Sequence, residues 1–238
     1  TQTEVEEQVD LMYSLIHQQV DAIVLVPIDS KALVQPVVEA VRKGVPVINI
    51  DIRLDTQLLE QAGVEVAFVG PDNFAAAYEV GKLLDKKLRN EDKVAIIEGL
   101  TAADNAQQRK RGFIKAIEEK GLRLVASEPA DWETEKAAEV FQAMWMRYPD
   151  LKAVYCSNDA MALGVLQQMQ EKNCYLPVVG FDNDAVMKEF LSTGKLVATA
   201  DIFSSQMAVR GIEFALDVLE GKIENRGVHS TAYEIIKQ

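Results

Sequence analysis

The chain has 238 residues, of which 48% are hydrophobic, so it is long enough for one large domain or two smaller ones, each with its own core. Its 37 acidic and 25 basic side chains give a formal net charge of −12, which argues against a nucleic-acid partner, since a phosphate backbone needs a basic face. No apolar run has membrane-spanning length, and no signal peptide is recognisable; a mature exported protein would lack one as well.

The opening residues 1–19 predict a helix with Val5, Val9, Met12 and Ile16 on one face. Strand-length apolar runs then follow at residues 22–28, 45–50, 66–69, 94–97, 122–126, 153–156, 178–181 and 196–200. Between most of them lie stretches of helical periodicity, at residues 33–41, 74–88, 105–119, 134–146, 161–169 and 206–219. Such alternation predicts an α/β fold of parallel sheets covered by helices on both faces.

The alternation is interrupted near residue 71, which favours two doubly wound lobes over one closed barrel. Residues 51–65 are irregular rather than a clean crossover helix, and "GPDN" at 70–73 breaks the pattern before the next helix. A doubly wound lobe normally begins with a strand, and none precedes the first helix. We therefore expect the N-terminal lobe to be incomplete, lacking a strand–helix–strand unit.

Polar side chains follow nearly every predicted strand, where open parallel sheets bind their ligands. They are Asp29, Asp51, Asp72, Glu98, Asp131 with Trp132, Asn158, Asp182 and Asp201. We interpret Asp29, Asp72, Asp159 and Asp184 as helix caps. For Asp51, Asn158 and Asp182 a neighbouring residue can already cap, so both a ligand role and a local role stay open.

The helix at 105–119 carries an arginine on its buried side. Arg109 and Asn105 lie four and eight residues before Phe113, on the same face as the core stripe. We expect Arg109 to point to the strand-end cleft; the alternative is a surface pair with Glu98 or Asp104. Trp132 lies between a strand and a helix, where we expect it to stack on a ligand. Carboxylates, amides, a guanidinium and an aromatic plane together suit the hydroxyls and the C–H face of a sugar ring.

The sequence assembles no recognisable catalytic or metal site, and we expect no cofactor. His17 and His229 have no partners at ligand spacing, and we interpret Cys156 and Cys174 as unpaired thiols. "VVGFDND" at 178–184 is similar to the nucleophile motif of haloacid-dehalogenase-type phosphotransferases. In that family the motif opens the domain, whereas here little more than fifty residues follow it. An enzyme is therefore the weakest of the interpretations.

Eight motifs occur in an order and spacing that resemble one family. They are "DAIVLVPID", "VPVINID", "GPDN", "NAQQRKRGF", "PADW", "CSNDAMALG", "VVGFDND" and "GKLVATA". Over essentially its whole length the sequence resembles the ribose-binding group of type I periplasmic sugar-binding proteins, the receptors of ABC importers. The effector-binding domains of lactose-repressor-type regulators share the fold and several motifs, and they are the alternative.

The resemblance implies two lobes with three crossings, a hinge that closes on a pentose, hexose or related polyol, and a periplasmic location (extracellular lipoprotein in a Gram-positive). The lobes would be residues 1–71 with 203–231, and 72–202 with 232–238. Implied partners are the transmembrane subunits of an ABC permease and a chemoreceptor or sensor kinase. The exposed edge of the partial lobe would favour self-association. Alone, the chain is expected to bind sugar weakly or not at all.

The motifs carry the family's ligand contacts onto particular residues. Five of the residues already chosen match the family's positions, namely Asp51, Arg109, Trp132, Asn158 and Asp182. Asn105 remains a candidate from its place on the same helix face as Arg109. Two departures concern the sugar. Ile52 stands where ribose binders have an arginine, so Arg53 is the candidate there, and Ile202 stands where they have a glutamine, beside Asp201.

Overall fold

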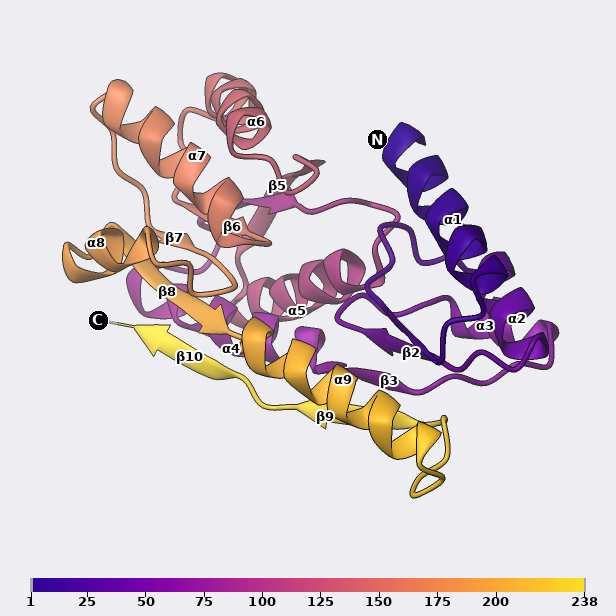
Figure 1. The fold of residues 1–238 in the computed structure, drawn as a ribbon. Helices are drawn as coiled ribbons and strands as arrows, with labels where there is room; N and C mark the ends of the chain where they lie inside the picture. Colours follow the sequence, from indigo (N-terminus) through magenta and orange to yellow (C-terminus); the bar gives the residue numbers. More distant parts are fainter. Residues whose placement is uncertain (1, 238) are drawn as a thin grey trace. The chain divides into compact units, whose positions relative to one another are not determined.

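The computed structural model describes residues 2–237, and within them the side chains of all but residues 2, 3 and 85. The chain forms two compact units (Figure 1). Unit 1 consists of Thr1–Pro71, Ala102–Asn105 and Phe203–Ala232. Unit 2 consists of Asp72–Thr101, Ala106–Ile202 and Tyr233–Gln238.

Unit 1 is built on a four-stranded parallel sheet in the order β1-β2-β3-β9. Its strands are β1 (Ile23–Leu25), β2 (Val47–Ile50), β3 (Phe68–Pro71) and β9 (Val228–Thr231). Helices α1 (Gln2–His17), α2 (Val34–Arg42) and α3 (Thr56–Gln61) share a core with Val47, whereas α9 (Ser204–Leu219) packs against Ile48 and Ile50. Because successive strand residues face opposite sides, the helices cover both faces of the sheet.

Unit 2 is built on a six-stranded sheet in the order β10-β8-β7-β6-β4-β5, parallel except for the pair β10 and β8. Its strands are β4 (Lys93–Glu98), β5 (Arg123–Pro129), β6 (Ala153–Cys156), β7 (Val178–Val179), β8 (Leu196–Asp201) and β10 (Glu234–Lys237). Its helices are α4 (Asn73–Lys82), α5 (Asp104–Lys120), α6 (Thr134–Arg147), α7 (Asp159–Glu171) and α8 (Met187–Ser192). Val154 and Cys156 face α6 and α7, whereas Tyr155 meets Phe113 of α5, so this sheet too is covered on both faces.

The predicted alternation of strands and helices is confirmed, with differences in detail. The short helices α3 and α8 were not predicted, and α3 lies within residues 51–65, which were expected to be irregular. The helix expected over residues 74–88 ends at Lys82 and is followed by the 3₁₀ turn Leu84–Lys87. Strands β9 and β10 were not expected, since "VHST" and "EIIK" are mostly exposed and lack a buried apolar run. The helical spacing of Trp145 and Tyr148 with Phe141 and Met144 predicts that they lie in the core, but both are only half-buried.

Helices α6 and α7 lie side by side (Figure 1) and approach closely at Gly164. A Cβ atom built on Gly164 would lie 2.0 Å from the backbone oxygen of Thr134. Glycine is the only residue that fits there without moving one of the helices.

Candidate functional site

Arg109 of α5 is the centre of a polar cluster in unit 2. It is 3% exposed, and its Nε donates to Asn73 Oδ1 at 2.9 Å. Its Nη1 donates to the Ser157 carbonyl at 2.8 Å and lies 3.3 Å from Asp182 Oδ1. The guanidinium is therefore held by three elements at the carboxyl ends of the strands. The alternative pairing with Glu98 is wrong, because that carboxylate accepts from Lys110 instead.

Two aromatic rings flank the guanidinium. Its central carbon lies 3.7 Å from the centroid of Phe181 and 5.5 Å from that of Trp132. Trp132 is half-buried and packs partly against the core, over Gly99, where a Cβ would come within 2.1 Å of the ring. Trp132 adopts a left-handed φ of 71°, and Asp131 before it one of 51°. Sparsely populated backbone of this kind is typical of functional sites, which supports a ligand role for the ring.

The structure exchanges the roles expected for Asn158 and Asp159. Asn158 is the N-cap of α7, and its Oδ1 accepts from the Met161 N–H at 2.8 Å. Asp159, which we interpreted as the cap, is instead fully buried inside the unit. Its Oδ1 accepts from the Thr199 hydroxyl and its Oδ2 from the Asp184 N–H, both at 2.9 Å. The cap prediction for Asp159 is therefore wrong. This cap uses the Asn158 Oδ1 and leaves its Nδ2 donor unused.

The loop after β7 carries Asp182 in an unusual conformation. Asp182 has a φ of 106° and Asn183 one of 59°. The Asn183 N–H donates to Thr199 Oγ1 at 3.2 Å, and its Nδ2 donates to Asp201 Oδ2 at 2.9 Å. The cap role expected of Asp184 is also wrong, since α8 begins after Val186 with no side-chain cap. Asp201 thus positions this loop, and Ile202 beside it is buried.

Burial raises the pKa of Asp159 to about 7, and the two hydrogen bonds it accepts only partly oppose this. Since its pKa in the unfolded chain is lower, its contribution to stability is fully present below about pH 4 and is lost as pH rises towards 7. We expect Asp159→Asn, which is neutral throughout, to gain up to about 4 kcal/mol relative to the parent between about pH 4 and 8. Urea unfolding of the variant and the parent at both pH values measures this. If the difference between their free energies of unfolding is the same at both pH values, the prediction is wrong.

The remaining predicted residues belong to unit 1. Asp51 follows β2 with a φ of 62°, and its N–H donates to the Val69 carbonyl at 3.1 Å. Asn105 is 5% exposed, and its Oδ1 has no hydrogen-bond partner among the described residues. Arg53 lies with its guanidinium 5.5 Å from the centroid of Phe68 and lines a small pocket with α3 residues.

Sequence reasoning missed four residues of the cluster: Asn73, Ser157, Phe181 and Thr199. Asn73 stands in the quoted "GPDN", but its neighbour Asp72 accepts from the Ala75 N–H and caps α4. The Asn73 side chain is therefore released for Arg109. Because Asp72 alone is enough to cap α4, the polar side chain of Asn73 next to it needs another partner, and the sequence could have indicated this.

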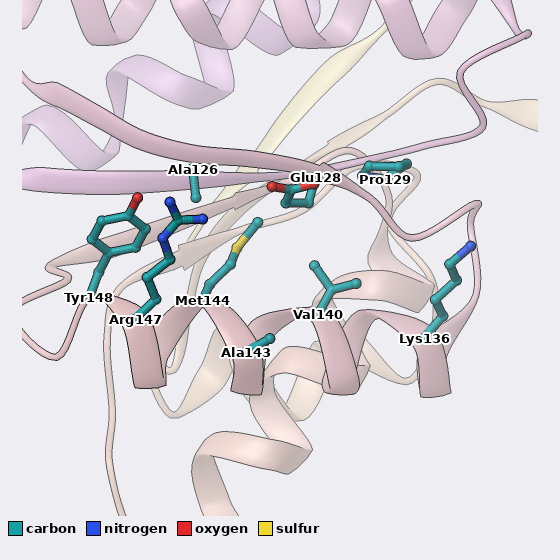
Figure 2. A pocket seen from close by; sticks show the side chains of 9 residues that line it. All are labelled: Ala126, Glu128, Pro129, Lys136, Val140, Ala143, Met144, Arg147 and Tyr148. Atoms are coloured by element: carbon teal, nitrogen blue, oxygen red, sulfur yellow. The ribbon is translucent and has the colours of Figure 1, made fainter.

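A separate pocket of about 350 Å³ lies on unit 2 between α6 and the edge strand β5. Figure 2 shows Val140, Met144 and Arg147 projecting from α6 towards this strand. None of the predicted site residues lines it, so it is distinct from the Arg109 cluster.

Within residues 2–237 no group of acidic, histidine or cysteine side chains could hold a metal ion, and both cysteines are free. Nor does any helix there have the length and apolar character to cross a membrane. The Arg109 cluster itself offers fixed donors and acceptors beside aromatic planes.

A model of the periplasmic binding protein domain matches residues 1–223. The chain belongs to the periplasmic binding protein family. A D-ribose/D-allose-binding protein of Pseudomonas aeruginosa is 41% identical over 240 residues, which are 99% of this chain and 75% of the relative. The D-allose-binding periplasmic protein of Escherichia coli is 33% identical, over 89% of this chain and 70% of its own.

Solved structures agree with this assignment. An ABC transporter solute-binding protein from Burkholderia multivorans superposes with a TM-score of 0.93 at 40% identity, covering 99% of this chain and 84% of that one. Another from Actinobacillus succinogenes, with bound D-allose, gives 0.91 at 32% identity, covering 98% and 84%. The resemblance to type I sugar-binding proteins and the expected fold of two doubly wound sheets are confirmed.

Proposed function

We propose that this periplasmic binding protein is the solute receptor of an ABC importer and binds a monosaccharide, a pentose, hexose or related polyol. The observation that carries the proposal is the buried Arg109, held by Asn73, the Ser157 carbonyl and Asp182 beside two aromatic rings. Relatives named for D-ribose and D-allose support the ligand class.

The proposed ligand residues in unit 2 are Arg109, Trp132, Asn158 and Asp182, and Asp201 and Ile202 are secondary candidates. Those in unit 1 are Asp51, Arg53 and Asn105. A planar donor or acceptor discriminates between sugars because a hydroxyl of the wrong configuration leaves it unpaired. Each unpaired group costs about 1–3 kcal/mol of binding free energy. Ile202 offers no such group, which favours a ligand other than ribose itself.

The rest of the proposal follows from the family. Closure of the lobes on the sugar, delivery to permease subunits and a periplasmic location (or a lipoprotein anchor outside a Gram-positive cell) are what such a receptor needs. A chemoreceptor or sensor kinase is a further proposed partner. Self-association would use β1, the edge strand of unit 1, which is followed by Val26, a residue 40% exposed. We propose no enzymatic activity and no cofactor, and the regulator alternative is not favoured.

A sugar titration followed by NMR tests the proposal, because chemical shifts report binding even at millimolar affinity. The panel should include D-ribose, D-allose, other pentoses and hexoses, and myo-inositol. We expect at least one sugar to shift the Trp132 indole and Asn158 side-chain signals in a saturable way. If every sugar leaves both signals unchanged, the receptor function is wrong.

Trp132 can be tested separately by fluorescence. Trp145→Phe leaves Trp132 as the only tryptophan and keeps a ring stacked on Phe141. In that background we expect sugar to change the emission of Trp132. Trp132→Ala should weaken binding by about 2 kcal/mol, about thirtyfold, because the C–H face of the sugar loses its aromatic cover. Equal affinity of a well-folded Trp132→Ala variant would exclude stacking.

A further inference from the structure

Asp159 is a buried carboxylate that the proposed sugar contacts do not use. It is 0% exposed, and no ion pair joins it to a cation in the described part of the chain. A charged side chain in this position is costly unless its hydrogen bonds serve a purpose. Its two acceptor bonds come from Thr199 of β8, which is also fully buried, and from the backbone of Asp184.

These bonds fix the loop that presents Asp182. The Asp159 N–H donates to the Phe181 carbonyl at 2.7 Å, so the residue holds this segment from both its backbone and its side chain. The fit is close, since a Cβ built on Gly180 would lie 2.0 Å from Asp159 Oδ1. The loop is therefore attached on either side of Asp182, whose own φ of 106° needs such support.

We propose that Asp159 is a positioning residue for sugar binding, which holds Asp182 against Arg109 and sets the affinity through its own charge. The inference rests on the proposed function and adds a residue that touches no sugar. As a carboxylate, Asp159 accepts both the Thr199 hydroxyl and the Asp184 N–H. Once protonated it must donate one hydrogen, and the buried Thr199 hydroxyl then needs another acceptor. Protonation thus loosens the loop and weakens binding.

The charged groups around Asp159 favour its protonation in a physiological pH range. Asp182 and Asp184 on the adjoining loop both raise its pKa, in addition to the effect of burial. Cys156 on β6 is buried and neutral, since burial raises the pKa of its thiol, and Asp201 lies beyond Asn183. Arg109 contacts Asp182 and makes no ion pair with Asp159 in the described structure.

The experiment measures sugar affinity by NMR titration from about pH 8 to about pH 5.5, a range that includes the pKa of about 7. We expect the affinity of the parent to fall about tenfold on acidification, a typical size for coupling between two sites. Asp159→Asn imitates the protonated acid at every pH. Its affinity should therefore be independent of pH and equal to that of the parent at the acid limit.

Asp184→Asn is the matched control, because it removes a neighbouring exposed carboxylate whose side chain makes no hydrogen bond in the described structure. Asp184→Asn should still lose affinity for sugar on acidification. The midpoint of this loss should lie at lower pH, because the Asp184 charge that raises the pKa of Asp159 is gone. If Asp159→Asn binds as tightly as the parent at pH 8, or follows the same pH profile, the inference is wrong. Should that variant not fold, Thr199→Val removes one of the two donors and is expected to weaken binding at pH 8; unchanged binding would overturn the inference.

A second readout separates this inference from the proposed function. Hydrogen exchange of the Asp184 amide, compared between variant and parent at the same pH, reports the bond to Asp159 without any sugar. We expect faster exchange in Asp159→Asn at pH 8 and equal exchange at pH 5.5. If no sugar binds the parent but this pattern is found, the proposed function fails and the positioning of the loop stands. Equal exchange at both pH values overturns the inference.

Discussion

Replacing Arg109 with methionine is expected to reduce sugar affinity by at least about a hundredfold. The change removes a guanidinium that is 3% exposed and leaves Asn73, the Ser157 carbonyl and Asp182 without their shared donor. Removing one partner from such a largely buried polar cluster costs about 3–5 kcal/mol, because Asn73 and the Ser157 carbonyl stay buried without this donor. Arg109→Lys should also be impaired, since a single ammonium cannot satisfy three acceptors in the geometry of a planar fork.

The measurement is a titration with the sugar that binds most tightly in the panel, with the melting temperature recorded for each variant. Arg111→Met is the matched control, because Arg111 lies on the same helix with an exposed side chain. It should bind as the parent does. If Arg109→Met remains folded and retains parental affinity, Arg109 does not contact or position the ligand, and the site would have to lie elsewhere.

Gly164→Ala is expected to destabilise unit 2 by about 3 kcal/mol or more, the largest effect we expect from a single methyl group. The new Cβ would lie 2.0 Å from the Thr134 carbonyl oxygen and 2.9 Å from its carbon. Both are backbone atoms at the start of α6, so relief requires the two helices to move apart. Because the core cluster packs Phe141 and Met144 of α6 against Val165 and Met169 of α7, that movement opens cavities.

Gly81→Ala provides the comparison, since Gly81 is also inside a helix at a packed face. Its Cβ would meet Ala116 at 3.1 Å and ring atoms at 3.4 Å, all on side chains. The higher helix propensity of alanine, about 1 kcal/mol, should offset this mild crowding. Denaturant unfolding of both variants decides the matter: similar stabilities for Gly164→Ala and Gly81→Ala would contradict the role of the close helix contact.

Periodicity was sufficient to predict the α/β fold and the position of Arg109. The arginine lies one helical turn before Phe113, and a helix places both on one face whatever the tertiary structure. The strands β9 and β10 could not be predicted in this way, because they are short, mostly exposed and stabilised by neighbours far away in the sequence.

The exchange of Asn158 and Asp159 has a different cause. Both residue types cap helices well, so the sequence allows either to begin α7. The choice depends on Thr199 and the Asp184 amide, which lie 40 and 25 residues further along the chain and satisfy the buried carboxylate. Asn73 was missed for the same reason, since its partner Arg109 lies 36 residues away.

The order of the chain through the two units constrains how the protein is made. Strand β3 ends at Pro71, yet its outer neighbour β9 begins only at Val228, and β10 completes the other sheet from Glu234. Neither sheet can be completed until residues 228–237, which form β9 and β10, have been synthesised. Non-local pairing of this kind slows folding, so we expect the sheets to be completed late in synthesis. Each unit consists of three separate segments of the chain, so neither can be produced whole by expressing one continuous stretch of the sequence.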